Sequence, residues 1–187
     1  MARLPYADRD RAPEPVREAL DALPPLNIFR MVANAETAFR PWLRLGGALL
    51  SALELDPRLR ELAILHVGRL ERAEYEWVQH VPIARGVGAT VEEIAAIDRG
   101  ELEDDALDSQ TRAVLRFTTE AVREVRVSEE ALAGVREQGL SPREVVELLL
   151  VISYYMGVAR LTESAGVEVD GPLGDQVAAS AARPPQR

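Results

Sequence analysis

The sequence predicts an all-α protein that folds as one helical domain. Apolar residues recur at helical spacing along most of its 187 residues, and no segment shows the sustained alternation of a strand. Helix-start signals are strong: a residue able to cap a helix is followed directly by proline at Asp56-Pro57 and again at Ser141-Pro142. A chain of this length has room for one domain with a proper core. We expect that domain over residues 1–170, followed by a tail over 171–187.

The first half of the chain is expected to form a short helix, a helix pair and two longer helices. They cover residues 15–23, 27–53, 56–70 and 74–85. Prolines on both sides limit the first helix, and Asp56 with Pro57 at the first helical position opens the third. The last two helices form the central antiparallel pair of the expected fold.

The second half holds four more expected helices, each opened by a side chain that can cap it. They cover residues 90–100, 108–125, 128–139 and 141–166, the last ending between Ser164 and Gly166. Thr90 with Glu93, and Ser141 with Glu144, have the spacing of a capping box. The tail beyond Gly171 is rich in alanine and proline, and we expect it to be disordered or to pack on a partner.

Composition excludes several classes of function. The net charge of −9 argues against nucleic acid and against anionic membranes as partners. The chain has no cysteine, which excludes thiolate chemistry and disulfides, and no lysine, which excludes Schiff-base catalysis. Its N-terminus lacks the apolar run of a signal peptide, and its longest apolar run, 148–152, is too short to span a bilayer. We therefore expect a cytoplasmic location.

Glu61 is the first candidate for acid–base chemistry. Ile64, Leu65 and Gly68 lie on its face of the expected helix, and a carboxylate on an apolar face is costly unless it is paired or neutral. Burial would raise its pKa and suit it to proton transfer. A buried ion pair with an arginine is the structural alternative, and the face alone favours that alternative.

Glu76 and His80 are the second candidate, four residues apart on one helical face. A carboxylate beside an imidazole orients the ring and raises its basicity, which suits a general acid or base, although exposed pairs of this kind are common. Pro82 lies two residues further on and should kink the helix and free an acceptor beside His80. His66 lies between apolar neighbours, so we expect a core or interface role for it.

A metal site is not expected. Glu76 and His80 could supply two ligands, with His66 or Glu61 as a third, but the chain has only two histidines and no HExxH signature. We expect no metal and no cofactor.

Two runs in the centre of the sequence carry a family resemblance. They are RELAIL at 60–65 and AEYEWVQHVPIA at 73–84. Together with LNIFR at 26–30, ELLL at 147–150 and the tyrosines at 154 and 155, they resemble the carboxymuconolactone decarboxylase family, which shares its fold with the alkylhydroperoxidase AhpD-like proteins. The resemblance covers about residues 20–170. It implies an AhpD-like helical bundle and a homo-oligomer, trimeric or hexameric.

The resemblance also implies what this chain lacks. The peroxidase branch of the family uses a glutamate, two cysteines and a histidine. The glutamate falls on Glu61 and the histidine on His80, but the cysteine positions fall on Ala73 and Glu76. A thiol peroxidase mechanism is therefore excluded, and the resemblance favours a cofactor-free lyase or isomerase acting on a small organic acid or lactone. A binding or scaffold protein that keeps the fold is the alternative.

The site expected from this resemblance brings Glu61, Glu76 and His80 to one cavity. His80 would be the main proton-transfer group, Glu76 would orient or charge it, and Glu61 would complete the relay. The expected substrate-binding residues are Tyr75 and Trp77, for which aromatic core packing is the alternative, and Arg30. Arg40 and Arg44 are equivalent candidates to hold a substrate anion.

Overall fold

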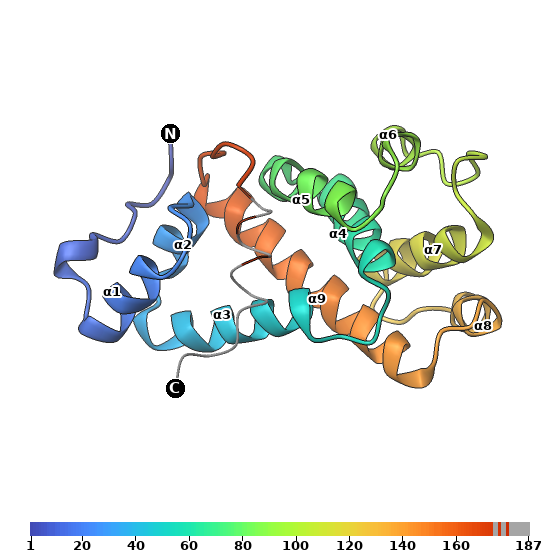
Figure 1. The fold of residues 1–187 in the computed structure, drawn as a ribbon, viewed down its shortest axis with the longest axis horizontal. Helices are drawn as coiled ribbons and strands as arrows, with labels where there is room; N and C mark the ends of the chain where they lie inside the picture. The colour runs from blue at the N-terminus through green and yellow to red at the C-terminus, as the bar shows by residue number, and fades with distance from the viewer. Residues whose placement is uncertain (174–175, 177–178, 180–187) are drawn as a thin grey trace.

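A helix of 24 residues, α9, runs through the molecule and packs against several of the other helices. The computed structural model describes residues 1–173, 176 and 179, and these contain helices and no strand. In Figure 1, α9 runs diagonally through the molecule, with α1 to α3 toward one end and α6 to α8 toward the other. The elements are η1 (Arg9–Arg11), α1 (Glu14–Asp21), α2 (Asn27–Val32), α3 (Glu36–Ser51), α4 (Pro57–Glu71), α5 (Glu74–Gly86), α6 (Val91–Arg99), α7 (Ser109–Arg123), α8 (Glu129–Glu137) and α9 (Pro142–Ala165).

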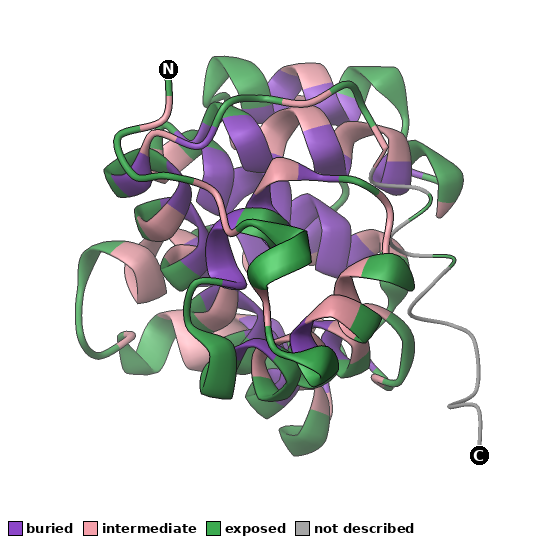
Figure 2. Ribbon diagram, turned by 90° about the vertical axis from the view of Figure 1, so that its left-hand side faces the viewer, coloured by how far each residue is buried: buried purple, intermediate pink, exposed green. Residues whose placement is uncertain are grey.

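The most enclosed helix is α4, which packs against α5, α6, α7 and α9. Every residue from Leu59 to Gly68 is buried, including three that carry ionisable side chains. Figure 2 shows the same concentration of buried residues at the centre and of exposed residues at the periphery. A left-handed residue, Arg72, with φ of 57°, ends α4 and starts the short turn into α5. That turn folds α5 back along α4, as expected for the central antiparallel pair.

The helix-start signals of the sequence are confirmed. Side chains of Asp56, Thr90, Asp108, Ser128 and Ser141 each accept a hydrogen bond from the backbone N–H three residues ahead. Both expected capping boxes form, at Thr90 and at Ser141. These caps satisfy N–H groups that the first turn of a helix leaves without an intrahelical partner.

Some boundaries differ from the expectation. The pair expected over 27–53 is present as α2 and α3 but ends at Ser51, and η1 has no counterpart among the expected helices. Helix α5 continues through Pro82 to Gly86. Most of the tail lies outside the described residues, but Gly171 and Leu173 are described and contact α5.

Within the described part of the chain, α9 is long and apolar enough to cross a membrane by length and composition. This stretch is longer than the uninterrupted apolar run at 148–152. Half of it is buried inside the fold, where Leu148, Val151 and Ile152 pack in the core. The core helix of a soluble protein has the same composition.

The connection from α3 to α4 is fixed by a carboxylate of α9. Glu147 is 7% exposed, and its Oε2 accepts hydrogen bonds from the backbone N–H groups of Glu54 (2.9 Å) and Leu55 (2.8 Å). Its Oε1 accepts from Nε of Arg143 at 2.8 Å. One side chain therefore holds the loop that precedes the buried helix α4.

Replacing Glu147 with alanine should lower the free energy of unfolding by roughly 2–3 kcal/mol, because two backbone donors lose a charged acceptor. Urea denaturation measures the change. Glu54→Ala is the control: its exposed side chain forms an ion pair with Arg143, and losing an exposed pair should cost less than about 1 kcal/mol. Equal destabilisation by the two variants would contradict this role for Glu147.

Candidate active site

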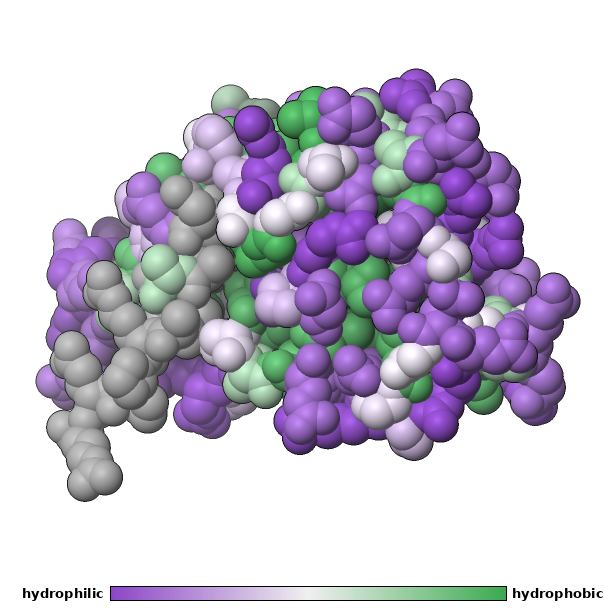
Figure 3. All heavy atoms as spheres, turned by 45° about the vertical axis from the view of Figure 1, so that its right-hand side comes forward, coloured by the Kyte–Doolittle hydropathy of each residue, from purple (hydrophilic) through white to green (hydrophobic). Residues whose placement is uncertain are grey.

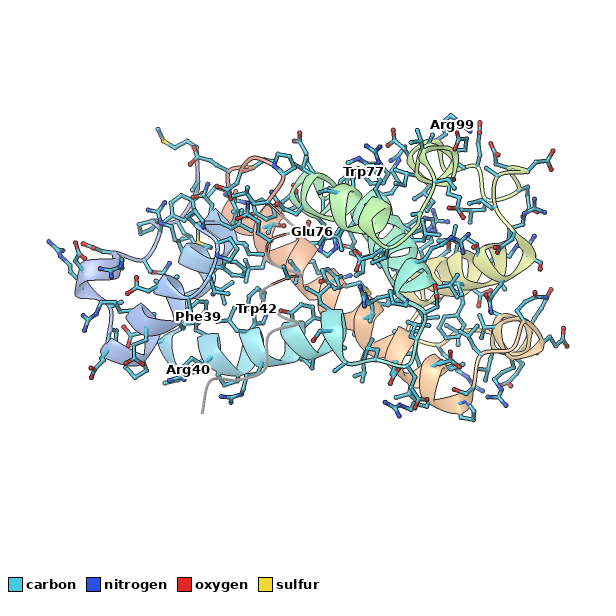
Figure 4. The ribbon with its side chains drawn as sticks, in the orientation of Figure 1. Phe39, Arg40, Trp42, Glu76, Trp77 and Arg99 are labelled. Carbon is cyan, nitrogen blue, oxygen red and sulfur yellow. The ribbon has the colours of Figure 1, made fainter. Side chains whose placement is uncertain are left out.

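A cavity of about 620 Å³ lies between the end of α1 and helices α2, α3, α5 and α9. Its wall is mostly apolar and aromatic, and few polar side chains interrupt it. They are Arg44, Ser51, Tyr75, Glu76, Gln79, His80, Tyr154 and Tyr155. Figure 4 labels Trp42 on α3 and Glu76 on α5, which both belong to this wall. A concave apolar pocket with a few convergent polar groups is the usual form of a small-molecule site.

His80 is held by a fully buried carboxylate. Glu61 of α4 has no exposed surface, and its Oε2 lies 2.8 Å from Nδ1 of His80. Nε of Arg60 donates to the other oxygen of Glu61 at 2.9 Å. Arg60 itself is only 5% exposed, so α4 contributes a buried ion pair between adjacent residues. The ion pair considered for Glu61 is therefore present, and it occurs together with the contact to His80.

These contacts define the tautomer of His80. Glu61 accepts from Arg60 on one oxygen, so it is also the acceptor for the imidazole, and Nδ1 of His80 carries the donated proton. Nε2 is then the second, reactive nitrogen of a ring that lines the cavity. No described residue forms a hydrogen bond to it.

The partner of His80 is thus Glu61 and not Glu76, the residue expected to orient it. The side chain of Glu76 is 2% exposed and lies within 3.1 and 3.3 Å of the Thr162 hydroxyl through its two oxygens. Helical spacing brings Glu76 to the same wall as His80, but a neighbouring helix supplies the closer carboxylate.

Glu76 is a carboxyl whose charged form is disfavoured. Burial raises its pKa to about 7, and the ordinary value is 4.5. The single proton of Thr162 has two carbonyl acceptors in its own helix, at Val158 (3.1 Å) and Ala159 (3.0 Å). When that proton is donated to a carbonyl, the Thr162 oxygen can accept from a protonated Glu76. The geometry therefore accommodates the neutral acid.

The chain segment after α9 forms hydrogen bonds to two residues of the cavity wall. The hydroxyl of Tyr75 donates to Oδ2 of Asp170 at 2.7 Å. Gln79 donates to the carbonyl of Gly171 at 2.9 Å and accepts from the N–H of Leu173 at 2.9 Å. Tyr75 thus belongs to the cavity wall, but its hydroxyl is already engaged by Asp170.

A continuous set of ring contacts joins α3 to His80. Trp42 stacks on Tyr154 with ring centres 5.5 Å apart, Tyr154 meets Tyr155 at 5.3 Å, and Tyr155 meets the His80 ring edge-on at 4.8 Å. Gly46 makes room for this set, because a Cβ there would lie 2.9 Å from the Tyr154 ring. Sequence reasoning quoted the two tyrosines but assigned them no role, and it missed Trp42 because nothing local indicates which face of α3 meets α9.

Of the three candidate arginines, only Arg44 lines the cavity. It is exposed, on α3, and no described residue forms an ion pair with it. Arg30 is not on this wall: it lies over the ring of Tyr6 and donates to Asn27. Arg40 is exposed one turn before Arg44 and is also outside the cavity.

Trp77, expected in the substrate pocket, lies elsewhere. It packs against a smaller apolar cluster and borders a shallow groove on the other side of α5. Figure 4 shows Trp77 on the side of α5 away from α3 and Trp42. Residues 76 and 77 are neighbours, so the helix turns one inward and the other outward.

His66 has the core position expected for it. It is 2% exposed, and its Nε2 lies 2.7 Å from the hydroxyl of Thr119. Burial, with Arg123 and Arg69 nearby, lowers its pKa to about 4. It is therefore a neutral ring outside the cavity.

The described residues contain no group of three His, Asp or Glu side chains placed to hold a metal ion. At the positions that resemble the peroxidase cysteines, Ala73 precedes α5 and Glu76 lies in its first turn. Both residues are buried. Neither has a thiol, so neither can form a disulfide.

Comparison with solved structures identifies the fold over almost the whole chain. A peroxidase-related protein from Ralstonia eutropha, described as an alkylhydroperoxidase AhpD core, matches with a TM-score of 0.78 and 19% identity over 98% of this chain and 97% of its own. A peroxidase-related protein from a Silicibacter species matches with a TM-score of 0.79 and 16% identity over 94% and 95%.

A variant of the debrominase Bmp8, solved in complex with 2,3,4-tribromopyrrole, matches with a TM-score of 0.72 and 14% identity over 94% and 93%. A search of curated proteins gives no match. The model of the carboxymuconolactone decarboxylase family matches residues 36–120, which include Glu61, Glu76 and His80. This segment is therefore similar to the carboxymuconolactone decarboxylase family, and the chain has the AhpD-like fold and no cysteine.

Proposed function

We propose that this protein is a cofactor-free acid–base enzyme that transfers a proton to or from carbon in an organic acid or lactone. The observation that carries the proposal is the Glu61–His80 hydrogen bond of 2.8 Å at the wall of an apolar cavity. The carboxylate fixes the ring and its tautomer, while Nε2 exchanges the proton with the substrate. Decarboxylation, isomerisation and lactone chemistry all need such a group.

Glu76 supplies the second acid of the proposed site. With a pKa of about 7, it is partly protonated near neutral pH, whereas Glu61 is engaged by Arg60. Two carboxyl groups in different surroundings can hold different protonation states, which is the basis for assigning acid and base roles. Glu61 then orients His80, and Glu76 and His80 carry the mobile protons.

A decarboxylation at this site balances with these groups alone. The bond from carbon to the carboxylate breaks, carbon dioxide leaves, and the electron pair stays on carbon. A proton from Glu76 or His80 forms the new C–H bond, and water returns a proton to the enzyme. An isomerisation uses the same groups to remove a proton at one carbon and deliver it at another.

The cavity favours this proposal over the alternative of a silent scaffold. A scaffold that keeps the fold has no need of an unfilled volume of about 620 Å³ beside a buried ionisable cluster. Thiol peroxidase activity is not proposed, because no thiol exists in the chain. A cytoplasmic location stays a prediction from the sequence.

We also expect a homo-oligomer. Val146, Leu149 and Leu150 on α9 are 56%, 37% and 48% exposed, which leaves apolar surface on the core helix. On the face drawn in Figure 3, hydrophilic residues cover most of the surface and hydrophobic patches lie between them. Light scattering at micromolar concentration should give a multiple of the chain mass, and the mass of one chain would contradict the expectation.

Glu76→Gln should make the protein less sensitive to pH. Folding raises the pKa of this carboxyl from 4.5 to about 7, so the native state keeps a proton that the unfolded state releases within that window. Its contribution to stability is therefore lost as the pH rises. Relative to Glu76→Gln, the parent should lose roughly 3 kcal/mol of unfolding free energy between pH 4.5 and pH 8.

Urea denaturation at several pH values measures this difference. Glu163→Gln is the control, because Glu163 is an exposed neighbour that acts on Glu76 only by charge repulsion. If the difference in unfolding free energy between the parent and Glu76→Gln stays constant with pH, the pKa of Glu76 is not raised in the folded protein.

His80→Asn should lower turnover by about a hundredfold or more, the usual scale for a general acid–base group. Asparagine keeps an N–H near the Nδ1 position to donate to Glu61, so the buried carboxylate retains a partner while Nε2 is removed. Deuterium uptake from solvent into carbon, followed by NMR across a panel of lactones and unsaturated acids, detects the reaction.

His66→Gln is the matched control, since it keeps a donor to Thr119 and lies outside the cavity. It should react at the parental rate. Turnover by a folded His80→Asn protein within about threefold of the parent, below the scale of acid–base catalysis, would move the proton-transfer role elsewhere.

A further inference from the structure

We propose that the ligand of this cavity is a monocarboxylic acid with a large apolar body, whose carboxylate is held by Arg44 at the mouth. The inference rests on the proposed function for the position of the reacting group, and it narrows the substrate class. Size, polarity, charge and the different exposure of Arg44 and His80 support it in turn.

The volume is too great for a small lactone acid. A cavity of about 620 Å³ corresponds to about twenty water molecules in the liquid. It falls in the range that encloses ligands the size of a drug molecule, where most of the ligand surface is removed from water. A ligand of seven or so carbon atoms would leave much of the apolar wall in contact with water, at a cost of about 25 cal/mol per Å².

The wall matches an apolar body. Leu23, Leu26, Phe29 and Ile83 line the cavity with Trp42 and Val158. Several of the polar groups already have partners: the Tyr75 hydroxyl is bound to Asp170, and both ends of the Gln79 amide are bound to the segment after α9. Few polar atoms therefore remain to pair with a polar ligand, and unpaired polar groups on a buried ligand are costly.

The charge of the wall fits one carboxylate. Arg44 is the single arginine among the described residues that line the cavity. The guanidinium binds a carboxylate in a two-pronged arrangement, and Arg44 has no ion pair with any described residue that would compete for it. A second carboxylate on the ligand would meet Glu76, which becomes negative above a pH of about 7, and no second arginine.

The anchoring end and the reacting end of this ligand are different. Arg44 is exposed, whereas His80 is 7% exposed, and both line the same cavity. A ligand that touches both extends from the mouth to the buried wall, and its apolar body lies beside His80. The carboxylate held by Arg44 is therefore not the group that reacts, which favours proton transfer within the body over loss of that carboxylate.

Three probes of different size and charge test the inference: decanoate, decanol and hexanedioate. Trp42 lies on the cavity wall and Trp77 outside it, so the fluorescence of a Trp77→Phe protein reports on the cavity alone. Decanoate should bind saturably and at least about tenfold more tightly than hexanedioate, a difference easily resolved by titration. Hexanedioate binding more tightly than decanoate, or no saturable binding of decanoate, would overturn the inference.

Arg44→Gln supplies the charge test, with Arg40→Gln as the control from the same exposed helix face. Arg44→Gln should weaken decanoate by about tenfold or more and leave decanol within about twofold, because only the acid uses the guanidinium. Arg40→Gln should change neither. Equal effects of the two variants on decanoate would remove Arg44 as the anchor.

Decanoate has no carbon–carbon double bond or lactone ring to react, so its binding can be measured independently of turnover. Turnover of a small lactone acid without decanoate binding would overturn this inference and leave the proposed function in place. Decanoate binding that depends on Arg44, with no His80-dependent reaction of any acid, would support the inference and overturn the proposed function.

Discussion

A carboxylate with no exposed surface lies near the centre of the molecule, and the surrounding helices are arranged so that its charge is satisfied. Glu61 has an arginine on one oxygen and an imidazole on the other. Breaking such a buried pair costs several kcal/mol, roughly 3–5, whereas replacing all of it with packed apolar groups is often neutral or stabilising. Stability therefore does not account for the presence of this cluster. The cluster instead sets the tautomer and the orientation of the His80 ring, which lines the cavity.

The same constraint explains the rest of the architecture. Helix α4 is buried by its neighbours, so the position of each neighbouring helix matters. Capping side chains define the first residues of α4, α6, α7 and α9. Glu147 fixes the loop before α4, and the left-handed turn at Arg72 returns the chain so that α5 lies along it. The polar atoms that enter the interior are mostly paired, although Nδ1 of His66 and Nε of Arg112 have no hydrogen-bond partner among the described residues. The interactions that position α4 and α5 therefore also position Glu61 and His80.

Local signals in the sequence were enough for the helices but only partly for the site. Capping side chains act within three residues, so the helix starts could be predicted from Asp56, Thr90 and Ser141. The approach of Glu61 to His80 followed from family resemblance. The sequence could not show that Glu61 and not Glu76 would be the hydrogen-bond partner of His80. Glu76 lies one turn away on the same helix and Glu61 on another, and only the packing of α4 on α5 decides which carboxylate reaches the ring. The choice of Arg44 over Arg30 has the same origin: which arginine meets a cavity depends on how α3 packs against α5 and α9.

The contact between Gly46 and Tyr154 has a consequence for how the protein could respond to what it binds. Close-packed rings transmit displacement to their neighbours, since an interior at crystal-like density has little free space to absorb it. Trp42, Tyr154, Tyr155 and His80 form an unbroken series of such contacts, and all four line the cavity. A ligand that displaces the Trp42 ring is therefore expected to shift the His80 imidazole at the other end of the series. Occupancy of the cavity and the orientation of the His80 ring are therefore coupled. The absence of a side chain at Gly46 is what allows Tyr154 to pack closely enough to complete the series.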